Sequence, residues 1–231
     1  MKSTVIDFHA HILPGCDHGS RNVKTSLRQL SQAAEAGVDI VCATSHFYAH
    51  KEDVETFLER REKCLSLLKA EADGNLPRII PGAEVLAFEG IDRLPGLERL
   101  CLEGTKLLLL EMPFTPWTEV LIESVERLCE QESFRVILAH VERYDEDDIR
   151  YLCSLGALCQ VNADSFSGLF TKKHLKKLVS EDLVAFVGSD IHGADGGYNA
   201  WMKMRKRNQG FFEAIQEESN RFISSSKNEN R

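Results

Sequence analysis

The sequence predicts an α/β protein built as a distorted seven-stranded (βα)7 barrel, and three observations carry this prediction. Short β-branched and apolar runs alternate with longer amphipathic segments, as in parallel strands joined by helical crossovers. Seven such runs share 231 residues, and the resulting unit of about 33 residues is close to one βαβ repeat. Histidines and carboxylates follow most of the runs, and active sites of such barrels lie at the carboxyl ends of the strands. An open parallel sheet would show the same periodicity.

The expected strands come at regular intervals along the chain. They cover residues 4–8, 38–44, 78–80, 106–110, 135–139, 158–161 and 183–187. Between them, apolar residues recur at helical spacing over 27–34, 54–68 and 120–128, and again over 211–222 near the end. Ser20 is the expected N-cap of the first helix, Gly37 follows its C-terminus, and Gly156 stands in the same position before Leu158.

We expect one domain over residues 1–231, because no Gly-, Ser- or Pro-rich linker interrupts the pattern, with a frayed tail over 224–231. No apolar run approaches the roughly 20 residues of a membrane span, and the N-terminus lacks the apolar segment of a signal peptide. Seven cysteines without C-x-x-C spacing suit free thiols. We therefore expect a cytoplasmic protein without membrane insertion.

The charge balance argues against a nucleic-acid partner. The chain carries 28 Lys and Arg against 36 Asp and Glu, a formal net charge of −8. Extended binding to nucleic acid needs a basic surface that attracts phosphates. Nucleic acid is therefore not an expected partner.

Ligand-type side chains follow the predicted strands. His9 and His11 stand two residues apart, so an extended strand would point both imidazoles to one side. A lone histidine or glutamate at such a position is usually a hydrogen-bonded rim residue, but so many on one face would repel unless cations lay among them. Mixed nitrogen and oxygen ligands suit Zn, Mn or Fe. Further groups follow later strands, at His46, Glu84, Glu111, His140, Asp190 and His192.

These residues belong to longer phrases that resemble the polymerase-and-histidinol-phosphatase (PHP) family. Within that family the chain resembles the manganese-dependent tyrosine phosphatases of bacterial capsule and exopolysaccharide clusters, from residue 5 to about residue 193. The family's fold is a distorted seven-stranded βα-barrel, which agrees with the strand count. The phrases are His9-x-His11, Cys16-Asp17-His18-Gly19, Thr44-Ser45-His46, Gly82-Ala83-Glu84, Glu111, Ala139-His140-Val141-Glu142-Arg143-Tyr144 and Ser189-Asp190-x-His192.

The resemblance implies three divalent metal ions, Mn first, with Zn or Fe as alternatives. One metal would be held by His9, His11, Glu84 and Asp190. Glu84 would bridge to a second metal, which Glu111 and His140 complete, and the third would be held by His18, His46 and His192. The capsule phosphatases usually have aspartate where this chain has His18, so Asp17 remains an alternative ligand.

The activity implied by the resemblance is hydrolysis of phosphotyrosine by a hydroxide held between metals. The substrate would be a protein, specifically a bacterial tyrosine kinase of polysaccharide synthesis and export. Arg143 matches the family's phosphate-holding arginine; a salt bridge with Glu142 or Asp145 is the alternative. A second family arginine is replaced by Gly197, a role that Lys203 or Arg205 could take.

Two other functions stay open: a small-molecule phosphomonoesterase such as histidinol-phosphate phosphatase, and a non-catalytic metal-binding PHP module. An oligomer is also possible. Cys129 and Arg135 have the C-x5-R spacing of thiol phosphatases, but two glutamates and no glycine lie between them, so we expect no thiol chemistry. His50 is a weak candidate for the rim of the site, and His174 is expected in solvent.

Overall fold

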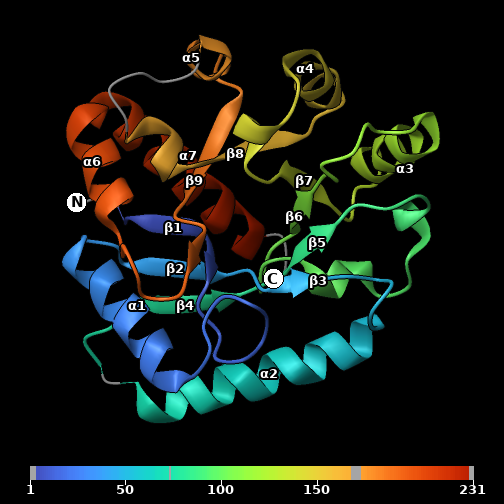
Figure 1. The fold of residues 1–231 in the computed structure, drawn as a ribbon. Helices are drawn as coiled ribbons and strands as arrows, with labels where there is room; N and C mark the ends of the chain where they lie inside the picture. The colour runs from blue at the N-terminus through green and yellow to red at the C-terminus, as the bar shows by residue number, and fades with distance from the viewer. Residues whose placement is uncertain (1–3, 73, 168–172, 229–231) are drawn as a thin grey trace.

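The computed structural model describes residues 4–72, 74–167 and 173–228. Its strands pair in parallel within two sheets, of order β10-β1-β2-β4 and β3-β5-β6-β7-β8-β9. The carboxyl ends of the strands meet near the middle of the molecule (Figure 1). The strands are β1 (Ile6–His11), β2 (Ile40–Ala43), β3 (His46–Phe47), β4 (Arg78–Pro81), β5 (Glu84–Leu86), β6 (Leu107–Glu111), β7 (Arg135–Leu138), β8 (Leu158–Asn162), β9 (Val184–Gly188) and β10 (Ile191–His192).

Six helices lie around the outside of the strands, and α7 crosses behind them (Figure 1). The helices are α1 (Val23–Glu35), α2 (Val54–Glu71), α3 (Glu119–Cys129), α4 (Glu146–Ser154), α5 (Lys173–Ser180), α6 (Asn199–Arg207) and α7 (Gln209–Asn228). Short 3-10 turns are η1 (Ile91–Arg93), η2 (Leu97–Leu100), η3 (Val141–Arg143) and η4 (Ala163–Phe166).

The ends of α1 differ in part from the prediction. Asn22, not Ser20, caps the helix, because its side chain accepts a hydrogen bond from the Thr25 N–H. The Ser20 hydroxyl instead lies 2.7 Å from that of Ser26. Gly37 ends the helix with φ +75°, as predicted, and Gly156 has φ +97° before β8.

The prediction of seven strands was incomplete, because three of them break and resume. β2 is followed by β3, β4 by β5, and β9 by β10. In one break Pro81 has no N–H to donate, and Gly82 passes so close to Leu102 that a β-carbon would lie 2.5 Å from its side chain. In another, Asp190 has φ +51°. Each break lies next to predicted site residues, so the irregular backbone positions the site.

One apolar cluster joins the two sheets. It takes side chains from β1, β2 and β4 of one sheet and from β6, β7 and β9 of the other, and Ile223 of α7 belongs to it. Within it, Phe8 stacks on Phe186 with ring centroids 3.9 Å apart. The pairing of β1 with β2 shifts register between Asp7 and Ala10. Phe8 therefore packs in this cluster while His9, its neighbour, still reaches the site beyond it.

The end of the described chain is helical. Of the segment 224–231, for which a frayed tail is predicted, α7 includes the residues up to Asn228, and residues 229–231 lie outside the described part. No helix among the described residues has the length and apolar character needed to cross a membrane.

Candidate metal centre

All nine predicted metal ligands lie together at the carboxyl ends of the strands. β1 supplies His9 and His11, and the loop after it supplies His18. Glu111 and His192 end β6 and β10, and His140 and Asp190 lie two residues after β7 and β9. His46 and Glu84 begin β3 and β5, which follow the carboxyl ends of β2 and β4. The strand register helps to gather them, because His46 lies opposite Glu84 and His11 opposite His192. Gly188 makes room for His9, since a β-carbon there would lie 2.4 Å from that of His9.

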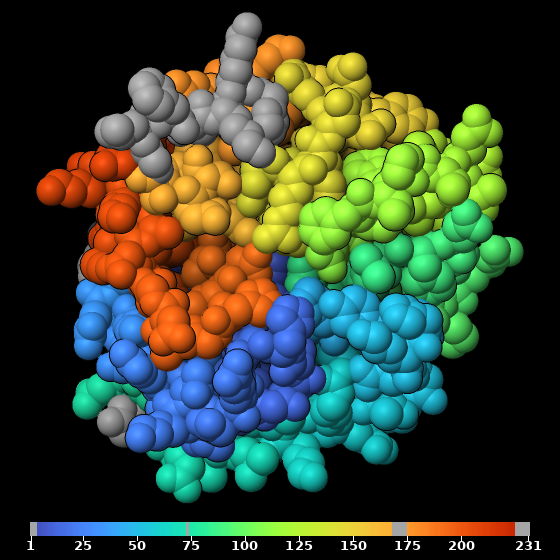
Figure 2. Space-filling view, in the orientation of Figure 1, coloured from blue at the N-terminus to red at the C-terminus, as the bar shows by residue number. Residues whose placement is uncertain are grey.

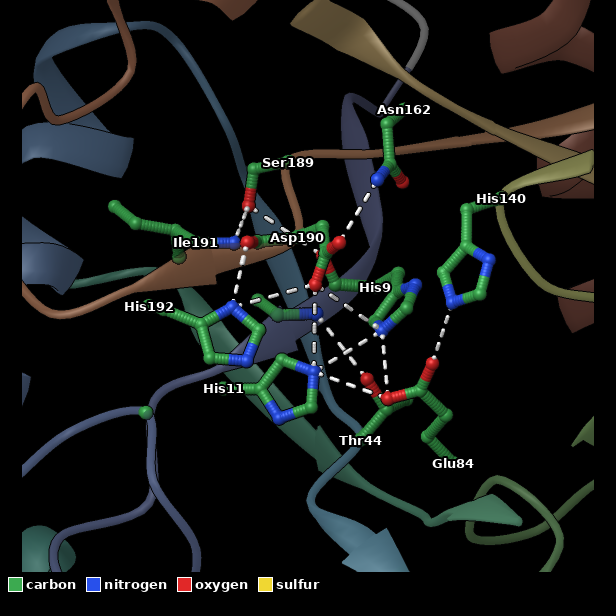
Figure 3. A network of polar contacts seen from close by, with 12 residues as sticks. His9, His11, Thr44, Glu84, His140, Asn162, Ser189, Asp190, Ile191 and His192 are labelled. Carbon is green, nitrogen blue, oxygen red and sulfur yellow. Dashed lines mark hydrogen bonds and ion pairs between the residues drawn. The ribbon is translucent and has the colours of Figure 1, made fainter. Parts of the chain in front are cut away.

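Glu84 contacts more of the ring nitrogens than the other carboxylates do, and Figure 3 shows its contacts with His9, His11 and His140. Its Oε2 atom is 3.3 Å from His9 Nε2, 3.2 Å from His11 Nε2 and 3.0 Å from His46 Nδ1. Its Oε1 atom is 2.9 Å from His140 Nε2. Both carboxylate oxygens of a side chain that is 1% exposed are thus surrounded by ring nitrogens.

The remaining ligand candidates lie on either side of Glu84. Glu111 is 3.4 Å from His140 Nε2 through Oε1 and 3.8 Å from His46 Nδ1 through Oε2. Asp190 Oδ1 is 3.6 Å from His9 Nε2 and 3.5 Å from His11 Nε2.

His18 and His192 complete the cluster on its more exposed side. The ring centroid of His18 is 4.8 Å from that of His46 and 4.6 Å from that of His192. His192 Nδ1 lies 3.4 Å from Asp190 Oδ1. The His11 ring centroid is 4.5 Å from that of His46 and 4.1 Å from that of His192, so His11 lies among these three rings.

The donor atoms suit metal ions better than hydrogen bonds to one another. Glu84 Oε2 and His46 Nδ1 are buried without a well-formed hydrogen bond, and buried polar atoms normally have a partner. His9 Nε2 and His11 Nε2 lie 3.1 Å apart, and at most one of them can donate. Three groups could each hold a metal ion: His11 with His46 and His192, His9 with His11 and Asp190, and His46 with Glu84 and Glu111.

The charges of the cluster also need cations. Burial lowers the pKa of His140, but hydrogen bonds with Glu111 and Glu84 outweigh burial and raise it to about 9. Burial raises the pKa of Glu84, yet the surrounding histidines hold it well below its usual range. The carboxylates thus favour a proton on His140 when no other cation is present. Metal ions would compete for these sites, since ligand histidines must be neutral.

Asp17 supports the histidines. Its Oδ2 lies 2.8 Å from His11 Nδ1 and accepts the His46 N–H at 3.0 Å, and Oδ1 accepts the Gly19 N–H at 2.9 Å. These bonds hold its pKa below the usual range despite burial. Asp17 therefore fixes the orientation of His11, and His18 is the residue of this pair that faces the other rings.

We expect Asp17→Asn to weaken metal binding about 10- to 100-fold without abolishing it, because a carboxylate that orients a ligand histidine contributes about that much. Turnover should recover when metal is added in excess. Titration of metal-free protein with Mn²⁺ would measure the change. Equal metal affinity in wild type and variant would contradict the supporting role.

Sequence reasoning assigned no role to three polar residues beneath the cluster. Gln160 of β8 accepts the His140 N–H at 2.7 Å and lies 3.2 Å from His9 Nδ1 through the same Oε1. Asn162 donates to Asp190 Oδ2 at 2.8 Å. The Tyr144 hydroxyl lies 3.2 Å from His140 Nδ1 and accepts the N–H of Met112. The available signal was the polar Gln and Asn inside an otherwise apolar strand.

Backbone strain is concentrated here. Of the described non-glycine residues, three have positive φ, and two of them are ligand candidates: His140 at +35° and Asp190 at +51°. Such conformations persist where surrounding contacts over-determine them. The bonds from the His140 N–H to Gln160 Oε1 and from the Asp190 N–H to the His9 carbonyl are contacts of this kind.

The cluster opens into a hollow of about 590 Å³, visible near the centre of the face in Figure 2. Arg143 lines it and donates to Asp190 Oδ2 at 3.0 Å, rather than to Glu142 or Asp145. Its guanidinium lies 5.7 Å from the ring centroid of Phe114. Phe114 is 70% exposed, and Tyr48 also lines the hollow, stacked on His46. One cation and two aromatic rings thus border the ligand candidates.

Among the described residues, no second arginine or lysine lines this hollow. Gly197 packs against Gln32 of α1. Arg205, proposed as a substitute, donates to the Ala36 carbonyl instead and lies over the Phe212 ring, because α6 turns that face toward α1 and α7. Lys203 is exposed and does not line the hollow. Arg143 is the one arginine or lysine lining it among the described residues.

The weaker candidates lie elsewhere. Cys129 ends α3, and burial with nearby Cys153 and acidic residues raises the pKa of its thiol to about 11. His50 is exposed and contacts Tyr48 at 5.7 Å between centroids, without lining the hollow. The side chain of His174 lies outside the described residues.

Parallel sheets with a buried cluster of histidines and carboxylates at their carboxyl ends define an α/β protein with a candidate multinuclear metal site. The family model of capsular polysaccharide synthesis CpsB/CapC proteins matches residues 5–205. The chain belongs to this CpsB/CapC family, as its resemblance to the capsule phosphatases predicted.

Individual relatives agree with this assignment. The tyrosine-protein phosphatase CpsB of Streptococcus agalactiae is 28% identical over 83% of this chain and 84% of its own. A chain from the crystal structures of YwqE from Bacillus subtilis and CpsB from Streptococcus pneumoniae, described as metal-dependent tyrosine phosphatases, superposes with a TM-score of 0.78 and 22% identity, covering 95% of this chain and 94% of its own. The β-aspartyl dipeptidase of Fervidobacterium islandicum gives a TM-score of 0.52 at 13% identity, over 93% and 72% of the two chains. The last two similarities concern the fold.

Proposed function

We propose that this protein is a metal-dependent protein-tyrosine phosphatase. The observation that carries the proposal is the convergence on Glu84 of four ring nitrogens, within 3.3 Å of its two oxygens, beneath a hollow lined by Arg143 and Phe114. A buried carboxylate shared by so many donors fits a bridging ligand between cations. The relationship to CpsB supports phosphotyrosine as the substrate.

The site would hold three divalent ions, with Mn as the first candidate and Zn or Fe as alternatives. His9, His11, Glu84 and Asp190 would hold one ion, Glu84 with Glu111 and His140 the second, and His18 with His46 and His192 the third. When bound, the ions would neutralise the phosphate and lower the pKa of water toward neutrality. Since none of the nine donors is missing, a non-catalytic module is disfavoured.

The residues of the hollow would bind the substrate. Arg143 can release Asp190 Oδ2, which Asn162 also holds, and donate to a non-bridging phosphate oxygen as negative charge develops there. Phe114 is an apolar ring with an unusually high exposure for its size, and it lies where the phenyl group of phosphotyrosine would leave the site. Aromatic pairing there would favour aryl over aliphatic phosphates.

We expect the protein with Mn²⁺ to hydrolyse a phosphotyrosine peptide and Phe114→Ala to lower kcat/KM for it about 3- to 10-fold, because one aromatic contact contributes about 0.5–1.5 kcal/mol. Turnover of histidinol phosphate, measured in parallel, should be slower and unaffected by the substitution. Leu67→Ala is a matched control, since Leu67 is an exposed apolar residue on α2. Faster turnover of histidinol phosphate than of the peptide would instead indicate a metabolite phosphatase.

The cellular setting follows from this activity. The substrate would be a bacterial tyrosine kinase of polysaccharide synthesis, in the cytoplasm. The chain would form one domain, in which the two sheets make one distorted barrel. β2 and β4 pair in one sheet and their continuations β3 and β5 pair in the other, while β10 pairs with β1 at the opposite edge. These connections support closure of the barrel.

A further inference from the structure

A second hollow of about 340 Å³ opens beside the candidate metal centre. One wall is the start of α1 and the other is the loop after β10, two segments that lie side by side in Figures 1 and 2. It shares His18 and His192 with the metal centre. A substrate peptide that leaves the candidate metal centre on this side would therefore enter the second hollow directly. We call this hollow the basic groove, after Arg21, Lys24 and Arg28, which line it.

The basic groove is positively charged in a protein whose net charge is −8. Its three cationic side chains are exposed, and none has a hydrogen-bond or ion-pair partner among the described residues. Asp195 is the one described carboxylate that lines it. Several other arginines are paired, for example Arg127 with Asp92 at 2.8 Å.

The position of these cations is unfavourable for α1 itself. Arg21 and Lys24 flank the N-cap Asn22, and the first turn contains no acidic residue. The helix dipole places partial positive charge at this end, so cations here are repelled and carboxylates preferred. The positive potential of the basic groove thus comes at a cost to helix stability, and a bound anion would relieve it.

We propose that the basic groove binds acidic residues next to the phosphotyrosine of the protein substrate. This inference rests on the proposed phosphatase function. With the phosphate in the metal centre, an extended peptide advances about 3.3 Å per residue, so the carboxylates of the next few residues would meet the three cations. Arg143 is the one described arginine or lysine in the site itself, so recognition of the flanking sequence falls to the basic groove.

Two phosphotyrosine peptides test the proposal, identical except that glutamates on both sides of the phosphotyrosine are glutamines in the second. Each is assayed with wild type, with Arg21→Gln/Lys24→Gln/Arg28→Gln, and with the control Lys63→Gln/Lys69→Gln/Lys203→Gln, which removes three exposed lysines outside both hollows. The groove variant should lose about tenfold in kcat/KM on the acidic peptide, the sum of several exposed ion pairs. Its kcat/KM on the glutamine peptide and on free phosphotyrosine should change less than about twofold.

Equal losses on both peptides, or a loss on free phosphotyrosine, would overturn the proposal, because the cations would then act on the phosphate or on the fold. So would an equal loss in the control variant, which would indicate general charge attraction. Free phosphotyrosine turnover by wild type tests the phosphatase function separately. If wild type shows no such turnover, the groove can still be tested by measuring the affinity for the same peptides carrying a non-hydrolysable phosphonate. Equal affinities of wild type and groove variant for the acidic peptide would then refute the proposed role of the basic groove.

Discussion

Replacing Glu84 with glutamine should remove bound metal and lower phosphotyrosine turnover by about a thousandfold or more, as expected for residues that act as a unit. The glutamine amide has nearly the same shape but no charge. Glu84 is 1% exposed and faces ring nitrogens with both oxygens. Its loss would therefore affect two proposed metal positions at once. Elemental analysis of purified protein should find fewer metal ions per chain.

The same Glu-to-Gln substitution at a position outside the site separates loss of metal from a general loss of folded protein. Glu103 is an exposed glutamate away from the site, so Glu103→Gln should retain both metal and activity. Circular dichroism would verify that the Glu84→Gln variant is folded. Full metal content together with normal turnover in that variant would refute the bridging role of Glu84.

The strands were predictable because burial on both faces leaves nearly continuous apolar runs in the sequence. Leu107 to Leu110 form such a run, and all four are buried in β6. The breaks after β2, β4 and β9 were not predictable in this way. They depend on contacts between distant segments, such as Leu102 against Gly82 and the His9 carbonyl with the Asp190 N–H.

The site was predictable to the extent that its residues follow strands. His9 and His11 point to the same side because they lie two residues apart in the extended β1. Parallel pairing brings the ends of the strands together. The roles of Asp17 and Gln160 required the structure. Both act through hydrogen bonds to histidines from other segments, and no spacing in the sequence encodes such a contact.

Chelation should abolish phosphotyrosine hydrolysis, whereas Cys129→Ser should change it less than about twofold. Thiol phosphatases use cysteine as a thiolate nucleophile, with a pKa lowered to about 3.5–7.5. Burial instead raises the pKa of Cys129 to about 11, with contributions from Cys153, Glu126 and Glu130. The residue ends α3 and does not line the hollow of the candidate metal centre.

The two treatments therefore give opposite results for the two chemistries. A metal site without its ions loses the cations that neutralise the phosphate and activate water, and a site based on Cys129 would be indifferent to chelator. Adding Mn²⁺ back after removal of the chelator should restore turnover, with Zn²⁺ and Fe²⁺ compared at equal concentration. Because Ser is nearly isosteric with Cys, Cys129→Ser tests the thiol with little change in packing around α3. Turnover that survives chelation but disappears in Cys129→Ser would show that the metal mechanism is wrong.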